Sequence, residues 1–547
     1  MFTGQLTGSE KLAFMKKIMI TLNILLLLSS EFFTSSVIAQ VQDKQPSLRV
    51  SMQRRLPSES EKGSYYISSK IEEWNPAQTA IIVCDMWDTH WCIGAAERVA
   101  EMAPFMNDVI SEARERGILI VHAPSQCLDF YKNHPARKLG QKYKSKKALN
   151  LISNEKLDSE KDAVWPVDQS DGGCNCTPEC KQGPPWPWKR QIDLIEISDK
   201  DAISDSGAEI GGLFYQKGIK NVILMGVHTN MCVIGRSFGL RNMVRLGMNV
   251  VLMRDMTDTM YDSKEAPQVN HFTGNSLVNE YIETYVSPSI LSTDLTGKKQ
   301  YRFKDDTRPV IAFLTAESEY FSNLTLPDFA HELLLKKDVT CEFAIGKPTE
   351  EGDDKHNIEN LQILEDADLA VIFIRRRGLE PRKMDMIKAY VNSGRPVLGL
   401  RTASHSFEPQ IKPELSNEFV ANLAKWPEFD RDILGGNYKG HFSNKTITTI
   451  SVVPGMESHP LMKDVSVENF TSSGGIYRNQ SLSSENAQVL LYGTIEGQPA
   501  QPMLWINNTG KNDVIYTSMG SIPDFKNPNF RQILLNSVDF LLSKKRK

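Results

Sequence analysis

A chain of 547 residues is too long for one hydrophobic core, so its length predicts two or three domains. Hydrophobic residues make up 40% of the chain and charged residues 24%, and the net charge at pH 7 is −4, as in an ordinary folded protein. This balance, without a stripe of Lys and Arg, argues against a nucleic-acid partner, and the basic C-terminal residues are interpreted as a solvated tail.

The first 39 residues have the pattern of a secretory signal peptide. Two lysines follow Met15, which is the start of the pattern; an apolar run covers 18–28, and small residues lead to Ala39. The run is too short for a permanent membrane span, and nothing helical continues it as a buried helix of the first domain would require. We therefore expect a signal peptide over 1–39, no membrane span, and an exported protein, periplasmic or extracellular.

A polar leader (40–74) precedes the first predicted domain, which covers 75–300. Its predicted strands are 79–84, 118–124, 192–198, 221–227 and 249–255, and its predicted helices are 95–117, 207–218 and Cys232 to about Leu246. An insertion at about 128–190, whose end is rich in Gly, Pro and Cys, is predicted to be a loop.

A second series of strands and helices fills the predicted domain 301–547. Its predicted strands are 309–316, 369–375, 396–407, 488–494 and 513–520, and its predicted helices are 326–336, 381–394 and 529–542. Strands that alternate with helices predict the α/β class, with two doubly wound domains. In each of them a mostly parallel sheet is covered by helices on both faces.

Three predicted strands of the first domain are followed by reactive side chains, namely those of Asp85, Lys200 and Cys232. We expect them to meet, because ligands bind beyond the carboxyl ends of the strands in open parallel sheets. Cys232 would be the nucleophile, Asp85 would carry its proton to a leaving amine, and Lys200 would stabilise the anion. The backbone N–H groups of Met231 and Cys232 would hold an oxyanion.

Each of these residues also has a simpler interpretation when it is considered alone. Cys232 would be a buried apolar filler, Asp85 a helix cap, and Lys200 part of a surface ion pair. Their occurrence in this order favours the catalytic interpretation. Cys84, which faces away from Asp85 on a regular strand, is assigned to packing.

The segment "GVHTNMCV" (226–233) resembles the nucleophile segment of the isochorismatase-like cysteine hydrolases, a family that includes nicotinamidases. "IIVCDMWDTH" (81–90) resembles the family's aspartate strand and "SDKDAIS" (198–204) its lysine element, so the resemblance covers about 75–290. It implies hydrolysis of an amide or related C–N bond through a thioester on Cys232, with a non-proline cis peptide next to Met231. Cys232 favours this reaction over vinyl-ether hydrolysis, because the isochorismatases of the family lack the cysteine.

The sequence departs from the nicotinamidase metal motif, because no Asp-x-His with a second His follows the strand at 118–124. Asp88, His90 and His122 are weak candidates for a zinc-type site, and we expect no metal or other cofactor. Candidate substrate-binding residues are Trp87, His90, Trp91, His122 and Thr229, with Trp186 or Trp188 as further pocket walls.

The motif "CNCTPEC" brings Cys174, Cys176 and Cys180 close together in the sequence. In an exported protein this spacing favours a local disulfide over zinc, since three thiols without a nearby histidine make a poor set of four ligands. Which two cysteines would pair stays open.

In the second domain, "GRPVLGLRTASHSF" (394–407) resembles the central strand, turn and helix of trehalose-utilisation-like domains, relatives of class I glutamine amidotransferases, and the resemblance covers about 308–545. Where amidotransferases place a nucleophilic cysteine, this chain has Thr402, Ala403 and Ser404, so we expect an accessory or binding domain. Carbohydrate is the candidate ligand, and the candidate pocket residues are His405, His441 and His459.

The leading hypothesis is an exported, homo-oligomeric hydrolase of small amides. Two alternatives stay open: a non-catalytic two-domain ligand-binding protein, and a carbohydrate-directed function in the C-terminal half.

Overall fold

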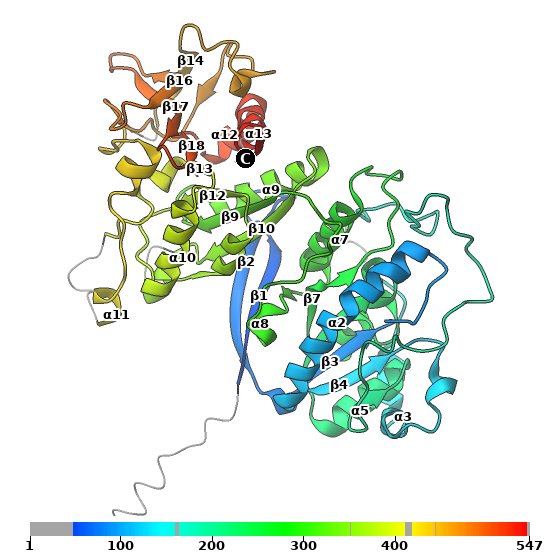
Figure 1. Cartoon of the computed structure of the whole chain (residues 1–547). Coiled ribbons are helices and arrows are strands. Elements are labelled where there is room, and N and C mark those ends of the chain that lie inside the picture. The colour runs from blue at the N-terminus through cyan, green and yellow to red at the C-terminus, as the bar shows by residue number, and fades with distance from the viewer. Residues whose placement is uncertain (1–46, 159–163, 350–351, 411–417, 444, 544–547) are drawn as a thin grey trace, which may run out of the picture. The chain divides into compact units, whose positions relative to one another are not determined.

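The computed structural model describes residues 47–158, 164–349, 352–410, 418–443 and 445–543 (Figure 1). The predicted signal peptide lies outside the described residues, as do residues 40–46 of the predicted leader. No helix in the described part of the chain is both long enough and apolar enough to cross a membrane.

The remainder of the predicted leader forms a β-hairpin at the edge of the first sheet. Strands β1 (Leu48–Pro57) and β2 (Tyr65–Trp74) pair antiparallel over their whole length, and β1 continues into the sheet through β8 (Ser289–Ile290). On β1, Leu48, Val50 and Met52 are buried in the core of the first sheet. On β2, Ile67 belongs to the core of the second sheet, against helix α9 (Ser322–Lys336).

The first sheet has eight strands in the order β2-β1-β8-β7-β6-β3-β4-β5, and it is parallel from β8 to β5. Its remaining strands are β3 (Thr79–Cys84), β4 (Leu119–Ala123), β5 (Ala202–Ile203), β6 (Asn221–Val227) and β7 (Asn249–Asp258). The helices of this half are α2 (Ile93–Glu115), α3 (Pro135–Gly140), α4 (Lys146–Leu151), α5 (Gly207–Lys217), α6 (Leu240–Arg245), α7 (His271–Tyr285) and α8 (Thr293–Thr296).

Alternation along the central strands decides which helices cover which face. On β3, Ile81 and Val83 pack in one core with the buried side of α2, whereas Ile82 and Cys84 pack in the other core with α5, α6 and α7. The two faces of the sheet are therefore both covered, which is the arrangement that parallel strands require.

Three predictions for this half are wrong. The insertion at about 128–190 is predicted to be a loop, but its first part contains the helices α3 and α4. Residues 192–198 form turns instead of a strand; Ile195 is buried there, but Leu194 is 49% exposed, so the run never lies within the sheet. The helix predicted from Cys232 to Leu246 is a π-helical turn (Thr229–Val233) followed by the separate helix α6, because the chain turns at 236–239.

The second sheet has ten strands in the order β11-β10-β9-β12-β13-β18-β17-β16-β14-β15. They are β9 (Val310–Ala316), β10 (Thr340–Gly346), β11 (Ile358–Glu359), β12 (Leu369–Ile374), β13 (Val397–Leu400), β14 (Thr448–Val452), β15 (Thr471–Ser472), β16 (Ala487–Thr494), β17 (Gln501–Asn508) and β18 (Asp513–Thr517). The run from β10 to β18 is parallel, and the other pairings are antiparallel.

Helices also cover both faces of this second sheet. Buried residues of α9 and α13 (Pro528–Ser543) share one core, and those of α10 (Pro381–Asn392) share the other. The short helices α11 (Glu418–Ala421) and α12 (Ile522–Lys526) complete this half. The predicted fold class, α/β with two mostly parallel or mixed sheets flanked by helices, is confirmed.

Gly226, near the end of β6, provides a test of how tightly the central strands are packed. Its φ is +113°, and a Cβ atom there would lie 2.1 Å from the carbonyl oxygen of Cys84 on β3. We expect Gly226→Ala to destabilise the protein by about 2 kcal/mol or more relative to Gly218→Ala, and calorimetric thermal unfolding measures the difference. Gly218 is the matched control, since its φ is +69° but a Cβ atom there would have nothing within 4 Å of it; equal effects would contradict the close approach.

Candidate active site

Asp85 occupies the position directly after the central strand β3. Its side chain is fully buried, and its Oδ1 accepts a hydrogen bond of 2.7 Å from the backbone N–H of Ser125. Its backbone has a φ of +47°, in the left-handed region that non-glycine residues seldom adopt. Strain of this kind, of order 1 kcal/mol, is typical of positions whose side chain must point in one direction, so Asp85 is a candidate functional residue.

Cys232 lies in the π-helical turn that follows β6, and its side chain is partly exposed. The thiol lies beside the Asp85 carboxylate, close enough for each group to shift the pKa of the other. Arg236, four residues further along the chain, donates from its Nε to Asp85 Oδ2 at 3.4 Å, and it lies close enough to Cys232 for the two groups to interact electrostatically. Since β3 and β6 are parallel neighbours, their carboxyl ends bring the acid and the thiol together at one edge of the sheet.

Burial dominates the electrostatics of this pair. It raises the pKa of Asp85, although Arg236 and the hydrogen bonds from Cys232 and Ser125 act in the opposite direction. Burial, with the neighbouring Asp85 charge, raises the pKa of Cys232 far above its ordinary range. The sulfur therefore holds its proton at neutral pH and needs a base to become a nucleophile.

Lys200 lies apart from this contact. Its side chain is exposed on a turn, and its backbone N–H donates to Ser198 Oγ at 3.4 Å. Within the described residues, the contacts of Asp85 and Cys232 do not include Lys200, and the nearby cation is Arg236. The physical reason is that 192–198 is not a strand, so Lys200 does not follow a carboxyl end of the sheet.

The backbone of the nucleophile turn differs from the expectation. The Met231 N–H, a predicted oxyanion donor, donates at 3.0 Å to the carbonyl oxygen of His228. The non-proline cis peptide expected next to Met231 is instead the bond between Val227 and His228.

A stack of aromatic rings stands beside Asp85. Trp87, whose backbone N–H donates to the Asp85 carbonyl oxygen, stacks on Trp188 with ring centroids 4.4 Å apart. Trp186 lies on the other side of Trp188 at 5.1 Å, and His90 lies 5.5 Å from Trp188. The insertion loop therefore contributes two rings to an aromatic wall beside Asp85.

Trp91 extends this wall, because its ring lies 5.3 Å from that of His90. Two other predicted substrate-binding residues are buried and occupied. His122 is bonded to Gln191 and Asp201 at 3.0 and 3.1 Å, and Thr229 donates to Asn275 at 3.3 Å. Both have 0% exposure, so their contacts hold the structure together and do not face a ligand.

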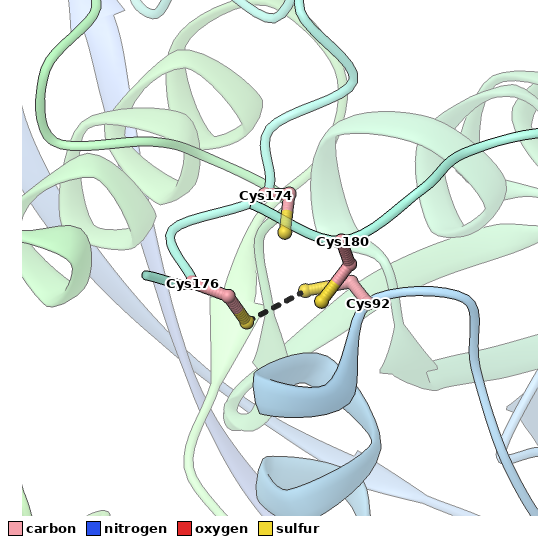
Figure 2. A group of neighbouring side chains, drawn as sticks. All are labelled: Cys92, Cys174, Cys176 and Cys180. Atoms are coloured by element: carbon pink, nitrogen blue, oxygen red, sulfur yellow. Dashed lines mark hydrogen bonds between the residues drawn. The ribbon is translucent and has the colours of Figure 1, made fainter. Parts of the chain in front are cut away.

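The weak metal candidates Asp88, His90 and His122 do not form one group. Asp88 accepts a hydrogen bond from the backbone N–H of Lys189 at 3.0 Å, while His122 is enclosed by its own partners. Among the described residues, a different group has metal-ligand geometry: Cys92, Cys174, Cys176 and Cys180 (Figure 2). All eight cysteines of the chain are free thiols in the structure, so the predicted local disulfide is not formed.

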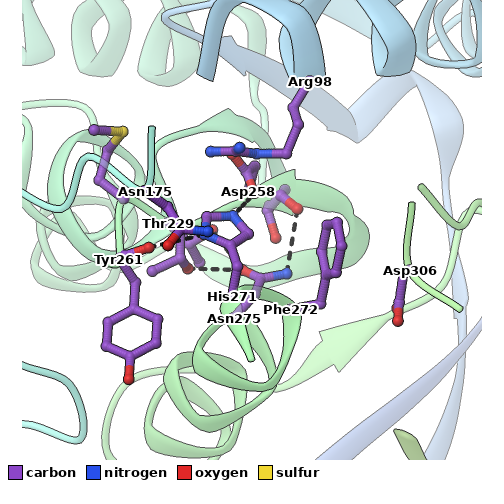
Figure 3. Close-up of polar contacts among 12 residues, drawn as sticks. Arg98, Asn175, Thr229, Asp258, Tyr261, His271, Phe272, Asn275 and Asp306 are labelled. Atoms are coloured by element: carbon purple, nitrogen blue, oxygen red, sulfur yellow. Dashed lines mark hydrogen bonds and ion pairs between the residues drawn. The ribbon is translucent and has the colours of Figure 1, made fainter. Parts of the chain in front are cut away.

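A second buried carboxylate, Asp258, ends β7 opposite Val227 of β6, and Figure 3 shows it among Arg98, Thr229 and His271. It binds Arg98 Nε at 2.8 Å and His271 Nε2 at 3.0 Å. Burial would raise the pKa of Asp258, but Arg98 and His271 lower it well below its ordinary value. Its charge is thus compensated on two sides, unlike the charge of Asp85.

Two residues of this region, Arg236 and Asp258, were not among the predicted site residues. Arg236 follows Cys232 at the i,i+4 spacing that brings helical side chains together, and Asp258 stands at the end of a parallel strand. These two signals were present in the sequence.

No protein-family model and no curated protein matches the sequence. Among solved structures, similarity is found to a cysteine hydrolase from Pseudomonas syringae pv. phaseolicola 1448A (TM-score 0.27, 15% identity, 41% of this chain and 93% of that chain). It is also found to an isochorismatase family protein from Desulfovibrio vulgaris subsp. vulgaris str. Hildenborough (TM-score 0.23, 13% identity, 40% and 97%). A ThuA-like protein from Parabacteroides merdae ATCC 43184 has a TM-score of 0.33 at 12% identity, over 44% and 93%. Likeness at these TM-scores does not establish a family or an activity for this chain.

The two buried carboxylates should respond in opposite ways to neutralisation. Because burial raises the pKa of Asp85, its ionised form destabilises the folded protein at pH 7. Asp85→Asn should therefore leave the midpoint of thermal unfolding unchanged or raise it. Asp258→Asn, the control, breaks a compensated buried network and should lower stability by about 3 kcal/mol.

Thermal unfolding as a function of pH measures both effects. The stability that Asp258 contributes is present above its unfolded-state pKa and is lost as pH falls toward its lower folded-state pKa, so the deficit of Asp258→Asn should shrink in acid. An Asp85→Asn variant as unstable at pH 7 as Asp258→Asn would contradict this assignment of the charges.

Proposed function

We propose that the chain is a cysteine hydrolase that cleaves a small amide or related C–N bond through a thioester on Cys232. The observation that supports this function best is the position of the Cys232 thiol beside the buried Asp85 carboxylate. Arg236 lies against both groups, and the site is at the carboxyl edge of the parallel strands.

In the proposed reaction, Cys232 Sγ attacks the carbonyl carbon while Asp85 accepts the thiol proton. Asp85 then gives this proton to the leaving nitrogen, the C–N bond breaks, and an amine and a thioester result. Water attacks the thioester, with Asp85 again taking a proton, so the acid product leaves and the thiol returns. Arg236 keeps its own proton throughout and stabilises the anionic partner, which moves between carboxylate and sulfur.

The wall of aromatic rings suggests the kind of amide that would fit. Trp87 and Trp188 offer flat apolar faces, and burial lowers the pKa of His90 to about 4, so its ring is neutral at physiological pH. A planar, uncharged acyl group would stack there without an unpaired charge. Planar amides are therefore the substrate class of the proposal.

The C-terminal half supports a binding role in the proposal. At the turn after β13 the chain has Arg401, buried and with a φ of +42°, whose guanidinium lies 3.9 Å from the ring centroid of Tyr320 and 4.9 Å from that of Tyr477. His405 stacks on Tyr438 at 4.5 Å. Apart from the partly exposed Tyr438, these rings are buried, and they pack against Arg401 or against one another. Carbohydrate remains the proposed ligand of this half on the resemblance of residues 394–407 to trehalose-utilisation-like domains.

Export, to the periplasm or outside the cell, also remains part of the proposal, and it rests on the signal pattern of residues 1–39. A homo-oligomeric state is also part of the proposal.

Substitution at Cys232 tests the catalytic proposal. With a panel of planar primary amides, Cys232→Ala should lower kcat/KM by roughly a thousandfold or more, because no other group supplies the nucleophile. Intact-mass spectrometry of the wild type should show an acyl adduct that the variant lacks. Full activity of Cys232→Ala, or a wild type inert to the whole panel, would favour a ligand-binding protein without catalysis.

A matched pair of cation variants separates the two basic residues. Arg236→Gln should lower kcat by roughly a hundredfold, since it removes the charge beside the reacting pair, whereas Lys200→Ala on the exposed turn should keep wild-type activity. Arg236→Lys should recover part of the rate. If Lys200→Ala lowered kcat more than Arg236→Gln, Lys200 and not Arg236 would be the catalytic cation.

A further inference from the structure

Four cysteines from two distant segments meet in the first half of the protein (Figure 2). Cys92 is the residue before helix α2, whereas Cys174, Cys176 and Cys180 come from the end of the insertion. Their four Sγ atoms all lie within 4.8 Å of one another. Cys92 supplies the fourth sulfur that the local sequence motif lacks.

The spacing of the sulfurs suits a shared ion better than a covalent bond. Cys92 Sγ and Cys176 Sγ are 3.7 Å apart. In a tetrahedral zinc site with Zn–S bonds of about 2.3 Å, neighbouring sulfurs are about 3.8 Å apart. A disulfide would need about 2.05 Å.

Backbone donors surround the group as they surround bound thiolates. The N–H of Ile93 donates to Cys180 Sγ at 3.4 Å, and that of Gly94 donates to Cys176 Sγ at 3.3 Å. A Cβ on Gly94 would lie 3.2 Å from Cys176 Sγ, so the absence of a side chain allows this approach. Both donors are at the N-terminus of the 23-residue helix α2, where the helix dipole favours negative charge.

The chemistry of the ligand set indicates which ion it would hold. Four thiolates select soft or borderline metals, and a complete set of four leaves no open position for substrate or water. Cys92 and Cys174 are almost completely buried, with 1% and 0% exposure, which fits a closed structural site.

We propose that Cys92, Cys174, Cys176 and Cys180 bind one zinc ion, which fastens the end of the insertion to the start of α2.

The ion would also support the aromatic wall beside Asp85, and this second part rests on the proposed function. Trp186 and Trp188 follow Cys180 in the same loop, and Trp188 stacks on Trp87. Met231, the neighbour of Cys232, packs against the cluster that contains the cysteines. Loss of the ion would therefore loosen a substrate wall and raise KM more than it lowers kcat.

Metal analysis of the full-length protein, purified without added metal or chelator, tests the site. Elemental mass spectrometry should find about one zinc per chain, and Cys176→Ser should lower this content at least tenfold. Cys341→Ser is the matched control, because Cys341 lies on β10 of the second sheet and should leave the zinc content unchanged. Zinc that is absent from the wild type, replaced by iron, or retained by Cys176→Ser would overturn the proposal.

A second measurement stays decisive if Cys176→Ser fails to fold. Zinc in the wild type is exchanged for Co²⁺, which should give the intense visible bands of a tetrahedral thiolate complex, and Cys232→Ala should give the same spectrum. Alkylation of the unfolded, unreduced protein should label all eight cysteines. Two disulfides within the group, with no cobalt spectrum, would overturn the zinc site and leave the hydrolase proposal intact.

Discussion

The burial of one carboxylate organises the first half of this protein. Asp85 is enclosed where β3 ends, and its backbone is held in a left-handed conformation while Ser125 donates to its side chain. A charge in this position is unfavourable unless it is paired, and the groups that reach it are a thiol and a guanidinium from the turn after β6. The fold thus places a carboxylate with a raised pKa, Asp85, beside a protonated thiol, Cys232, from which it can accept a proton.

The contrast with Asp258 explains why two buried carboxylates of one sheet would have different roles. Asp258 is compensated by Arg98 and His271, and on the sheet it lies opposite Val227, at the end of the strand that precedes the nucleophile turn. Asp85 is compensated on one side by Arg236, and its other neighbour is a neutral thiol. A change of protonation is therefore easier at Asp85 than at Asp258, which is what a proton-transfer group requires.

Local patterns predicted most of the regular elements, because periodicity reflects burial directly. The strand at 79–84, the helix at 95–117 and the strand at 221–227 agree with β3, α2 and β6 to within two residues. The hairpin of β1 and β2 escaped prediction, since its polar residues resemble a linker and β8, the strand that joins it to the first sheet, is remote in sequence. The run 192–198 alternates like a strand but lies outside the sheet.

Only those residues of the candidate site that directly follow a strand of the sheet could be predicted from the sequence. Asp85 and Cys232 follow adjacent parallel strands, so their meeting could be foreseen from the order of elements. Lys200 depended on a strand that does not exist. Cys92 joins three cysteines that lie more than eighty residues away, and only the folded chain brings these sulfurs together.

The hairpin of β1 and β2 has a consequence for how the molecule can be divided. Ile67 of β2 lies in the core of the second sheet, although β1 is hydrogen-bonded into the first. A cut between residues 300 and 301 would separate the polypeptide at a polar stretch and still leave each fragment incomplete. The C-terminal fragment would lose an apolar side chain from its interior, so the two halves share one folding unit through a ribbon supplied by the N-terminal side.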